Sequence, residues 1–188
     1  QAMSTTSQPF GLRPAFSPSG VIRPTAYSIL SGYSANILQN QPVKIGTNGT
    51  IEAAAIGDRF IGTFQGVEFT DSDGRRRVSN KWTASLAATE IVAYVTLDPT
   101  IVYEIQANGP IAVTDIGSQA DYTTITAGST VTGLSALMLD TASLTDSGNE
   151  ALRIIGLSPG PDNTFGDNFT IVEVQVAEHQ NVADRAAY

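Results

Sequence analysis

The run Asp71-Ser72-Asp73-Gly74 is the first place where residue types and spacing could do chemistry. Alternating carboxylates in a tight turn occur in the first half of a calcium-binding loop. A complete loop needs a third oxygen ligand and a distal Glu, whereas Arg75, Arg76 and Arg77 follow here and would repel a cation. Asp and Gly also favour a plain β-turn. We therefore expect a hairpin turn and no metal site.

The three arginines are the densest charge in an acidic chain of 188 residues with net charge −8. On a strand, Arg75 and Arg77 would share one face and Arg76 would point to the other. They either cap a solvated hairpin end or clamp carboxylates of a neighbouring subunit, because guanidinium groups form bidentate pairs with carboxylates. No nucleic acid partner is expected, since phosphates require a more basic surface.

Catalysis is not indicated by the remaining titratable residues. The chain has no Cys, which excludes disulfides, thiolate metal sites and cysteine nucleophiles. The single His179 follows Glu178 near the end of the chain, and we expect it to be a surface residue. A glycosidase pair among Asp162, Asp167, Glu173 and Glu178 has no spacing rule to support it. We expect no enzyme activity and no cofactor.

Short strands separated by turns are the elements that would position these residues. In the stretch 41–82, Pro42–Ile45 alternates apolar and polar residues, and Asn48-Gly49 is a strong hairpin signal. Gly66 interrupts an apolar run, where a bulge or a close backbone approach is expected. Strand signals recur about every ten residues without an amphipathic helix of ordinary length. The predicted class is all-β, as a single β-barrel or a β-sandwich, with a jelly-roll or decoration-type barrel as the candidate topology.

The remaining expected elements follow from the same patterns. Residues 134–144 fit either a strand or one to two helical turns, and we favour the strand. Residues 158–163 form a loop rich in Pro and Gly. Further strands are predicted at 91–95, 101–106, 111–113 (an antiparallel return), 151–157 and 169–176.

The first 26 residues lack periodicity and contain four of the nine prolines. We expect a disordered tail at residues 1–7. Beyond it, aromatic and aliphatic residues lie between the prolines, which is unusual for a solvated tail. The sequence therefore predicts an extended Pro-rich N-terminal arm (1–27), a β-domain (28–178) and a C-terminal tail (179–188). The expected contact residues in the arm are its aromatic and arginine side chains, Phe10, Arg13, Phe16 and Arg23.

Composition agrees with a protein that contacts others. Charged residues make up 15% of the chain, below the usual quarter, so much of the surface is either small and polar or covered by partners. No run approaches the roughly 18 apolar residues of a membrane span, and no signal peptide is indicated, so we expect no membrane association.

Several segments resemble head structural proteins of tailed bacteriophages, and more narrowly their small cement or decoration proteins. These segments are FGLRPAFSPSG (10–20), QPVKIGTNGTIEAA (41–54), GDRFIGTFQGVEFTDSDGRRRVSNKW (57–82), DPTIVYEIQANG (98–109) and LRIIGLSPGPDNTFGDNFTIVEVQVAEHQ (152–180).

The resemblance implies a non-enzymatic protein on the capsid exterior, assembled in the host cytoplasm. Its partner would be the major coat protein, and the chain itself would form a homo-oligomer, with a trimer favoured. The expected contacts are the four arm residues and Arg75, Arg76 and Arg77. The alternatives are a tail or fibre component, or a carbohydrate-binding or carbohydrate-acting β-protein.

Overall fold

The computed structural model describes residues 4–182, which contain β-strands, two 3₁₀-helices and no α-helix. No helix in that range is long and apolar enough to cross a membrane. The strands are β1 (Arg13–Phe16), β2 (Thr25–Tyr27), β3 (Pro42–Ile45), β4 (Ile51–Ala53), β5 (Gly62–Thr70), β6 (Arg76–Ser79), β7 (Thr89–Val95), β8 (Val102–Gln106), β9 (Gln119–Ala120), β10 (Gly128–Ser129), β11 (Leu134–Ser135), β12 (Leu152–Leu157) and β13 (Ile171–Val176). The 3₁₀-helices are η1 (Val113–Asp115) and η2 (Thr141–Ser143).

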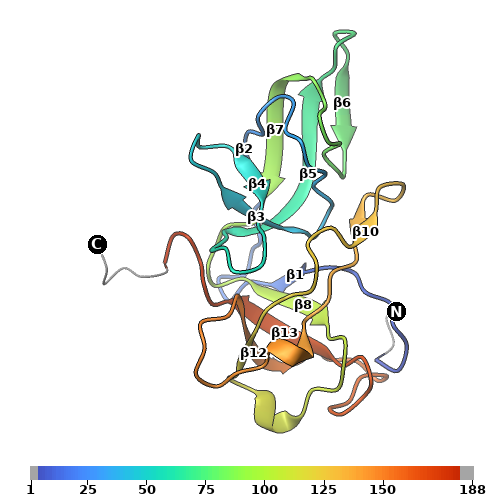
Figure 1. Cartoon of the computed structure of the whole chain (residues 1–188), viewed down its shortest axis with the longest axis vertical. Coiled ribbons are helices and arrows are strands. Elements are labelled where there is room, and N and C mark those ends of the chain that lie inside the picture. Colours follow the sequence, from blue (N-terminus) through green and yellow to red (C-terminus); the bar gives the residue numbers. More distant parts are fainter. Residues whose placement is uncertain (1–3, 183–188) are drawn as a thin grey trace.

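Two antiparallel sheets form the body of the molecule, one in the upper half and one in the lower half of Figure 1. The upper sheet has the order β2-β7-β5-β3-β4, with β6 paired to β5, and the lower sheet has the order β1-β8-β13-β12-β9. Strands β10 and β11 make a separate hairpin. The all-β class is confirmed, and two antiparallel sheets agree with the sandwich alternative. Among the described residues neither sheet closes on itself, so the single-barrel alternative is wrong.

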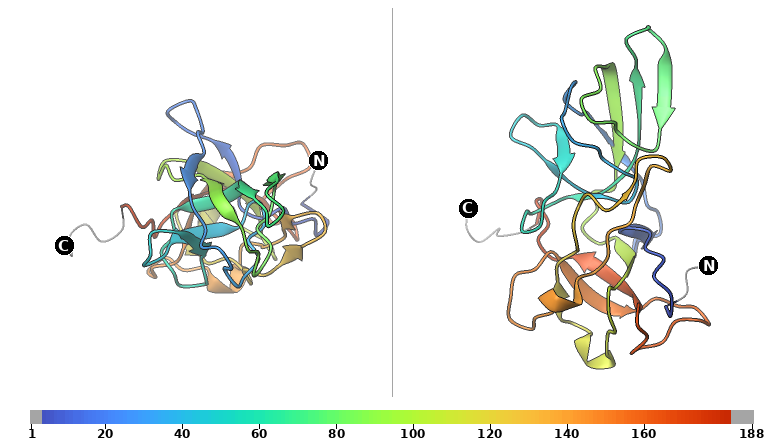
Figure 2. Two further views of the ribbon diagram at one scale, coloured as in Figure 1. Left: turned by 90° about the horizontal axis from the view of Figure 1, so that it is seen from above. Right: turned by 45° about the vertical axis from the view of Figure 1, so that its right-hand side comes forward.

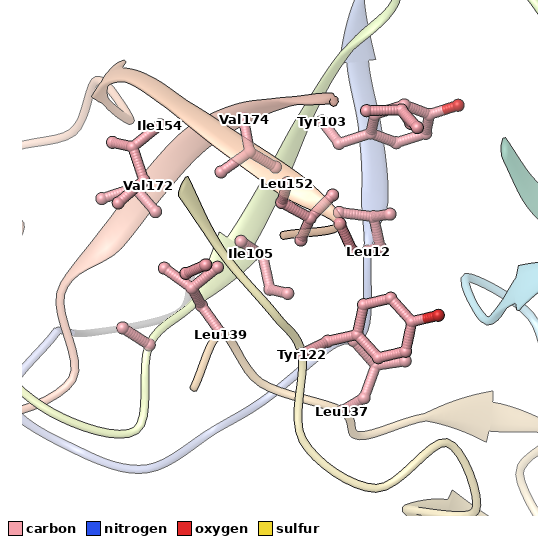
Figure 3. Packing of buried hydrophobic residues seen from close by; sticks show 14 of the residues in the cluster. Leu12, Tyr103, Ile105, Tyr122, Leu137, Leu139, Leu152, Ile154, Val172 and Val174 are labelled. Carbon is pink, nitrogen blue, oxygen red and sulfur yellow. The ribbon is translucent and has the colours of Figure 1, made fainter. Parts of the chain in front are cut away.

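Each sheet supports its own hydrophobic cluster. The lower cluster brings inward side chains of β8, β12 and β13 together with Leu12, Tyr122 and Leu139 (Figure 3). The upper cluster includes Phe64, Val95 and Trp82, with Trp82 edge-on to Phe69 at 6.1 Å between ring centroids. Fully burying one such side chain contributes about 1.5–3 kcal/mol. We call the two halves the upper lobe and the lower lobe.

The lobes meet at a buried polar junction. Gly62 approaches the backbone of Thr96 so closely that an added Cβ would lie 1.8 Å from the Thr96 carbonyl oxygen. The Thr63 N–H donates to Thr96 Oγ1 at 2.9 Å, and that hydroxyl lies 2.8 Å from the Tyr103 hydroxyl. Burial raises the pKa of Tyr103, which keeps it protonated. The junction is therefore closed by neutral hydroxyl groups.

Most predicted strands and turns are present. Gly49 has φ +78° in the β3–β4 turn, and the β5–β7 register shifts at Gly66, which confirms the bulge. Two predictions are wrong. Residues 111–113 do not form a returning strand, because the chain enters η1 at Val113. The stretch 134–144 is a strand only at Leu134–Ser135, because Leu137 and Leu139 then pack into the lower cluster, where Leu139 makes isolated bridges. The single turn of η2 at Thr141–Ser143 agrees in part with the helical alternative.

Candidate interaction site

The N-terminal residues lie along the lower lobe. The Ser4 hydroxyl lies 2.7 Å from the Asp162 carbonyl oxygen and also within bonding distance of the Asp167 carboxylate, so its one hydrogen is shared between the two acceptors. The second bond lowers the pKa of Asp167. The Phe169 N–H donates back to the Ser4 carbonyl oxygen at 2.8 Å. The disordered tail expected at residues 1–7 is therefore wrong from Ser4 onward, and residues 1–3 lie outside the described part.

The next residues are held by a buried amide. Gln106 of β8 is fully buried; its Oε1 accepts from the Gln8 N–H at 2.8 Å, and its Nε2 donates to the Thr6 carbonyl oxygen at 3.0 Å. Leu12 is fully buried in the lower cluster, and its N–H donates to the Asn40 carbonyl oxygen at 2.9 Å. These contacts make residues 4–12 part of the fold.

Strand β1 brings two predicted contact residues together. Arg13 lies opposite Glu104 in the β1–β8 register, and the Arg13 Nη2 to Glu104 Oε2 distance is 2.6 Å. The Arg13 guanidinium also lies over the Phe10 ring, 4.1 Å from its centroid. Phe10 and Arg13 thus already have partners within the chain.

The connection from β1 to β2 differs from the rest of the arm. Phe16 is 46% exposed, Val21 is 59% exposed, and Arg23 is exposed as well. Seen from above, this connection projects beyond the body of the molecule (Figure 2, left). Strand β2 then pairs with β7 of the upper sheet. The extended arm predicted at residues 1–27 thus contains two edge strands on two different sheets, and its exposed part runs from Phe16, the last residue of β1, through the loop that follows.

The Asp71–Gly74 run forms the predicted hairpin turn between β5 and β6. Asp71 Oδ1 accepts from the N–H groups of Asp73 at 3.0 Å and Arg75 at 2.9 Å, while Gly74 has φ +78°. The Asp71 pKa is lowered, first by its bond from Arg77 and next by its bond from the Arg75 backbone. Within residues 4–182 no cluster of three or more His, Asp or Glu side chains could hold a metal ion.

The arginines beside this turn are exposed and divide between the two faces of β6. Arg77 Nε lies 2.7 Å from Asp71 Oδ2. Arg76 donates to the Glu90 carbonyl oxygen at 2.6 Å and lies 3.6 Å from the Glu68 carboxylate. The opposite orientation of Arg76 and Arg77 is as expected. Their contact with a neighbouring subunit stays a prediction.

The C-terminal segment 177–182 lies level with the junction between the lobes, and we call it the C-terminal strap (Figure 1). Gln180 Oε1 accepts from the Ile45 N–H at 2.7 Å, and Gln180 Nε2 donates to the Ile45 carbonyl oxygen at 3.0 Å. The Phe60 N–H donates to the Glu178 carbonyl oxygen at 3.2 Å. The strap thus connects the end of β13 to the upper sheet, so residues 179–182 are not a solvated tail; residues 183–188 lie outside the described part.

His179 is the centre of the strap and is 1% exposed, so the expectation of a surface residue is wrong. Its Nε2 lies 2.9 Å from the Leu97 carbonyl oxygen, and its Nδ1 accepts from the Asn181 N–H at 3.1 Å. A neutral ring protonated on Nε2 satisfies both bonds. Burial lowers the pKa of His179. The alternating pattern ends at Val176, so nothing in the sequence indicated this burial.

The four residues considered for a catalytic pair of carboxylates have different hydrogen-bond and charge partners. Asp167 accepts from Ser4 and Thr164, and Glu178 lies 3.3 Å from Arg59. Asp162 contributes its backbone carbonyl to Ser4. Glu173 instead lies opposite Glu104 in the β8–β13 register, and burial, then the charge of Glu104, raises the Glu173 pKa. The sequence alone did not indicate that Glu173 faces Glu104, because this pairing depends on the β8–β13 register.

No family model matches this chain, and neither a curated protein nor a solved structure matches it. The candidate interaction site is therefore defined by geometry. It is the exposed segment 16–24, which runs from Phe16 at the end of β1 through the loop with Val21 and Arg23, and we call it the β1–β2 loop. The second candidate surface is the β6 hairpin with Arg75.

Proposed function

We propose that this chain is a structural virion protein that binds the outside of a phage capsid and stabilises the shell by bridging coat subunits. The observation that carries the proposal is the β1–β2 loop, which presents Phe16 and Val21 to solvent beside Arg23. Aromatic and arginine side chains are the commonest anchors of protein interfaces. The resemblance to cement and decoration proteins supports the same role.

In this role the protein acts by contact and not by chemistry. A loop of this size buries little area, and area alone does not set affinity, because ordering the partners costs free energy. Many copies on one closed shell compensate through multivalency, so each contact can be weak. The proposed partner is the major coat protein, on the capsid exterior. A homotrimer belongs to the same proposal.

The test uses heads of the phage that encodes this chain, prepared without it. Purified chain is added, bound protein is separated by sedimentation, and the copy number is measured relative to coat protein. We expect saturation at a simple ratio to coat protein and a higher temperature of DNA release. Binding of only a few copies per particle would favour a tail or fibre component, and absence of binding would contradict the proposal.

A further inference from the structure

The segment 4–16 is bound to the rest of the chain as a peptide would be. Its main contacts go to the lower lobe and to Asn40: the Ser4 bonds, the Gln106 amide, the burial of Leu12 and the Arg13–Glu104 ion pair. Strand β1 is the edge of the lower sheet and pairs only with β8 among the described strands. Removal of this segment would leave the β8 edge and a leucine-sized site open.

A turn with no bond outside itself follows the segment. In residues 17–21 the Gly20 N–H donates to the Ser17 carbonyl oxygen at 2.8 Å, and the Ser17 and Ser19 hydroxyl groups lie 2.7 Å apart. No hydrogen bond joins these five residues to any other described part of the chain. A hollow of about 250 Å³ is lined by Pro14, Ile22 and Pro24 from either side of the turn in sequence, together with Gln65 and Thr96. Ile22, packed on the lower cluster, marks the end of the turn.

We infer that residues 4–16 can be exchanged between two copies of this chain, with the turn 17–21 as the hinge. In the exchanged state the segment of one copy occupies the β8 edge of the other and repeats the same bonds. When the hinge opens, its five residues can span about 16 Å at 3.3 Å per residue. This length lets the segment leave its own lobe and reach the β8 edge of a second copy. Exchange of an identical element is a low-cost route to an oligomer because no new contact is needed.

The protein concentration decides whether the segment docks on its own chain or is exchanged with a second copy. A short linker holds the segment near its own site at an effective concentration in the millimolar range, so the dilute chain docks its own segment. Opening the hinge removes the local turn bonds and leaves the docking contacts unchanged. Dense packing, as on a shell, shifts the balance toward exchange. The inference concerns self-association and does not depend on capsid binding, so it is tested without particles.

The lack of cysteines makes a direct test possible. Arg13 and Glu104 are register partners on β1 and β8, at a separation that a disulfide can span. The double variant Arg13→Cys/Glu104→Cys is oxidised in monomer and oligomer fractions separated by size. We expect intrachain closure in the monomer and covalent multiples of the chain mass in the oligomer.

The matched control is Arg153→Cys/Gln175→Cys, register partners on β12 and β13. This pair should close within one chain in every fraction. Intrachain closure of the first pair in the oligomer would overturn the inference, as would the absence of any oligomer at high concentration. Failure of the first pair to close in both fractions would also overturn it, by contradicting the β1–β8 register.

A second variant acts on the hinge alone. Gly20 has φ +96°, which proline cannot adopt, so Gly20→Pro should open the turn and raise the oligomer fraction several-fold. Gly74→Pro is the control, because Gly74 also has positive φ and also donates to the residue three before it, in the β5–β6 turn. An equal oligomer fraction in Gly20→Pro and the parent, or an equal rise in both variants, would contradict exchange through this hinge.

Discussion

The two ends of the described chain are attached to the body in different ways. The N-terminal arm lies along the lower lobe from Ser4 onward and pairs as β1 with the lower sheet and as β2 with the upper sheet, with an exposed loop between the two strands. The C-terminal strap is short and continuous, and its central residue, His179, is almost wholly buried at the junction.

The difference indicates which segments stabilise the fold and which are free to bind a partner. The strap holds both lobes through backbone bonds and the Gln180 amide. The arm contributes Leu12 to the lower core but leaves Phe16 and Val21 exposed. Substitutions in the strap and at Leu12 should therefore change stability, and substitutions in the loop should change binding.

The largest expected effect is at Leu12, the buried residue of the arm. We expect Leu12→Ala to lower the free energy of unfolding by about 2–5 kcal/mol, because it removes buried methyl groups and leaves a cavity. Chemical denaturation measures the change, and Val21→Ala in the exposed loop is the control, with less than about 0.5 kcal/mol expected. Equal stability of Leu12→Ala and the parent would mean that the arm is not part of the core. From the sequence alone, deletion of residues 1–20 would be expected to leave the β-domain folded. Because the deletion removes the buried Leu12, we expect it instead to lower the free energy of unfolding.

The next effect is at Gln180 in the strap. Gln180→Ala leaves the N–H and carbonyl groups of Ile45 without their side-chain partner, which should cost about 1–3 kcal/mol in free energy of unfolding. Gln175→Ala is the matched control, because that amide makes one exposed bond, to the Thr100 carbonyl oxygen at 3.2 Å. Similar losses in the two variants would contradict a special role for the strap.

A smaller, pH-dependent effect is expected at His179. Its pKa in the folded protein is below the unfolded value of about 6.5, so the unfolded chain binds more protons between these two values. The stabilisation by neutral His179 is thus fully present above pH 6.5 and is lost as the pH falls toward the folded pKa. The slope is at most about 1.4 kcal/mol per pH unit.

The measurement is the free energy of unfolding between pH 7 and pH 5 for the parent and His179→Gln. The charge of Asp98 favours the protonated ring, and Glu178, the residue before His179, pairs with Arg59. These groups are the same in both proteins, so the difference in slope reports His179. Parallel curves for the two proteins would contradict the buried neutral ring.

Local chemistry explains why much of the fold was predictable. Asn48-Gly49 and Asp71–Gly74 each contain the residues that their turns require, and the apolar alternation around β13 fixes which side chains enter the core. Gly66 marked the bulge for the same reason. Such features depend on neighbours in sequence.

The features that were missed depend on partners far apart in sequence. Gln106 and Ser4 contact groups about 100 and 160 residues away, and His179 bonds to Leu97 across the junction. Prolines and aromatics in the arm indicated an extended chain that lies on something, but not which surface it contacts. Its docking on the chain's own sheets required the β1–β8 and β2–β7 registers.

The temperature at which heads release DNA tests the central claim most directly. Heads are saturated with the parent, with Phe16→Ala/Val21→Ser in the exposed segment 16–24, or with Val113→Ser/Val131→Ser, which alters two exposed valines outside both candidate surfaces that are 61% and 92% accessible. All three proteins should unfold at nearly the same temperature, because the substituted side chains lie outside the cores. We predict that the loop variant loses most of the protection and that the Val113/Val131 variant retains it. Full protection by the loop variant would contradict the account and would make the β6 hairpin with Arg75 the next candidate contact.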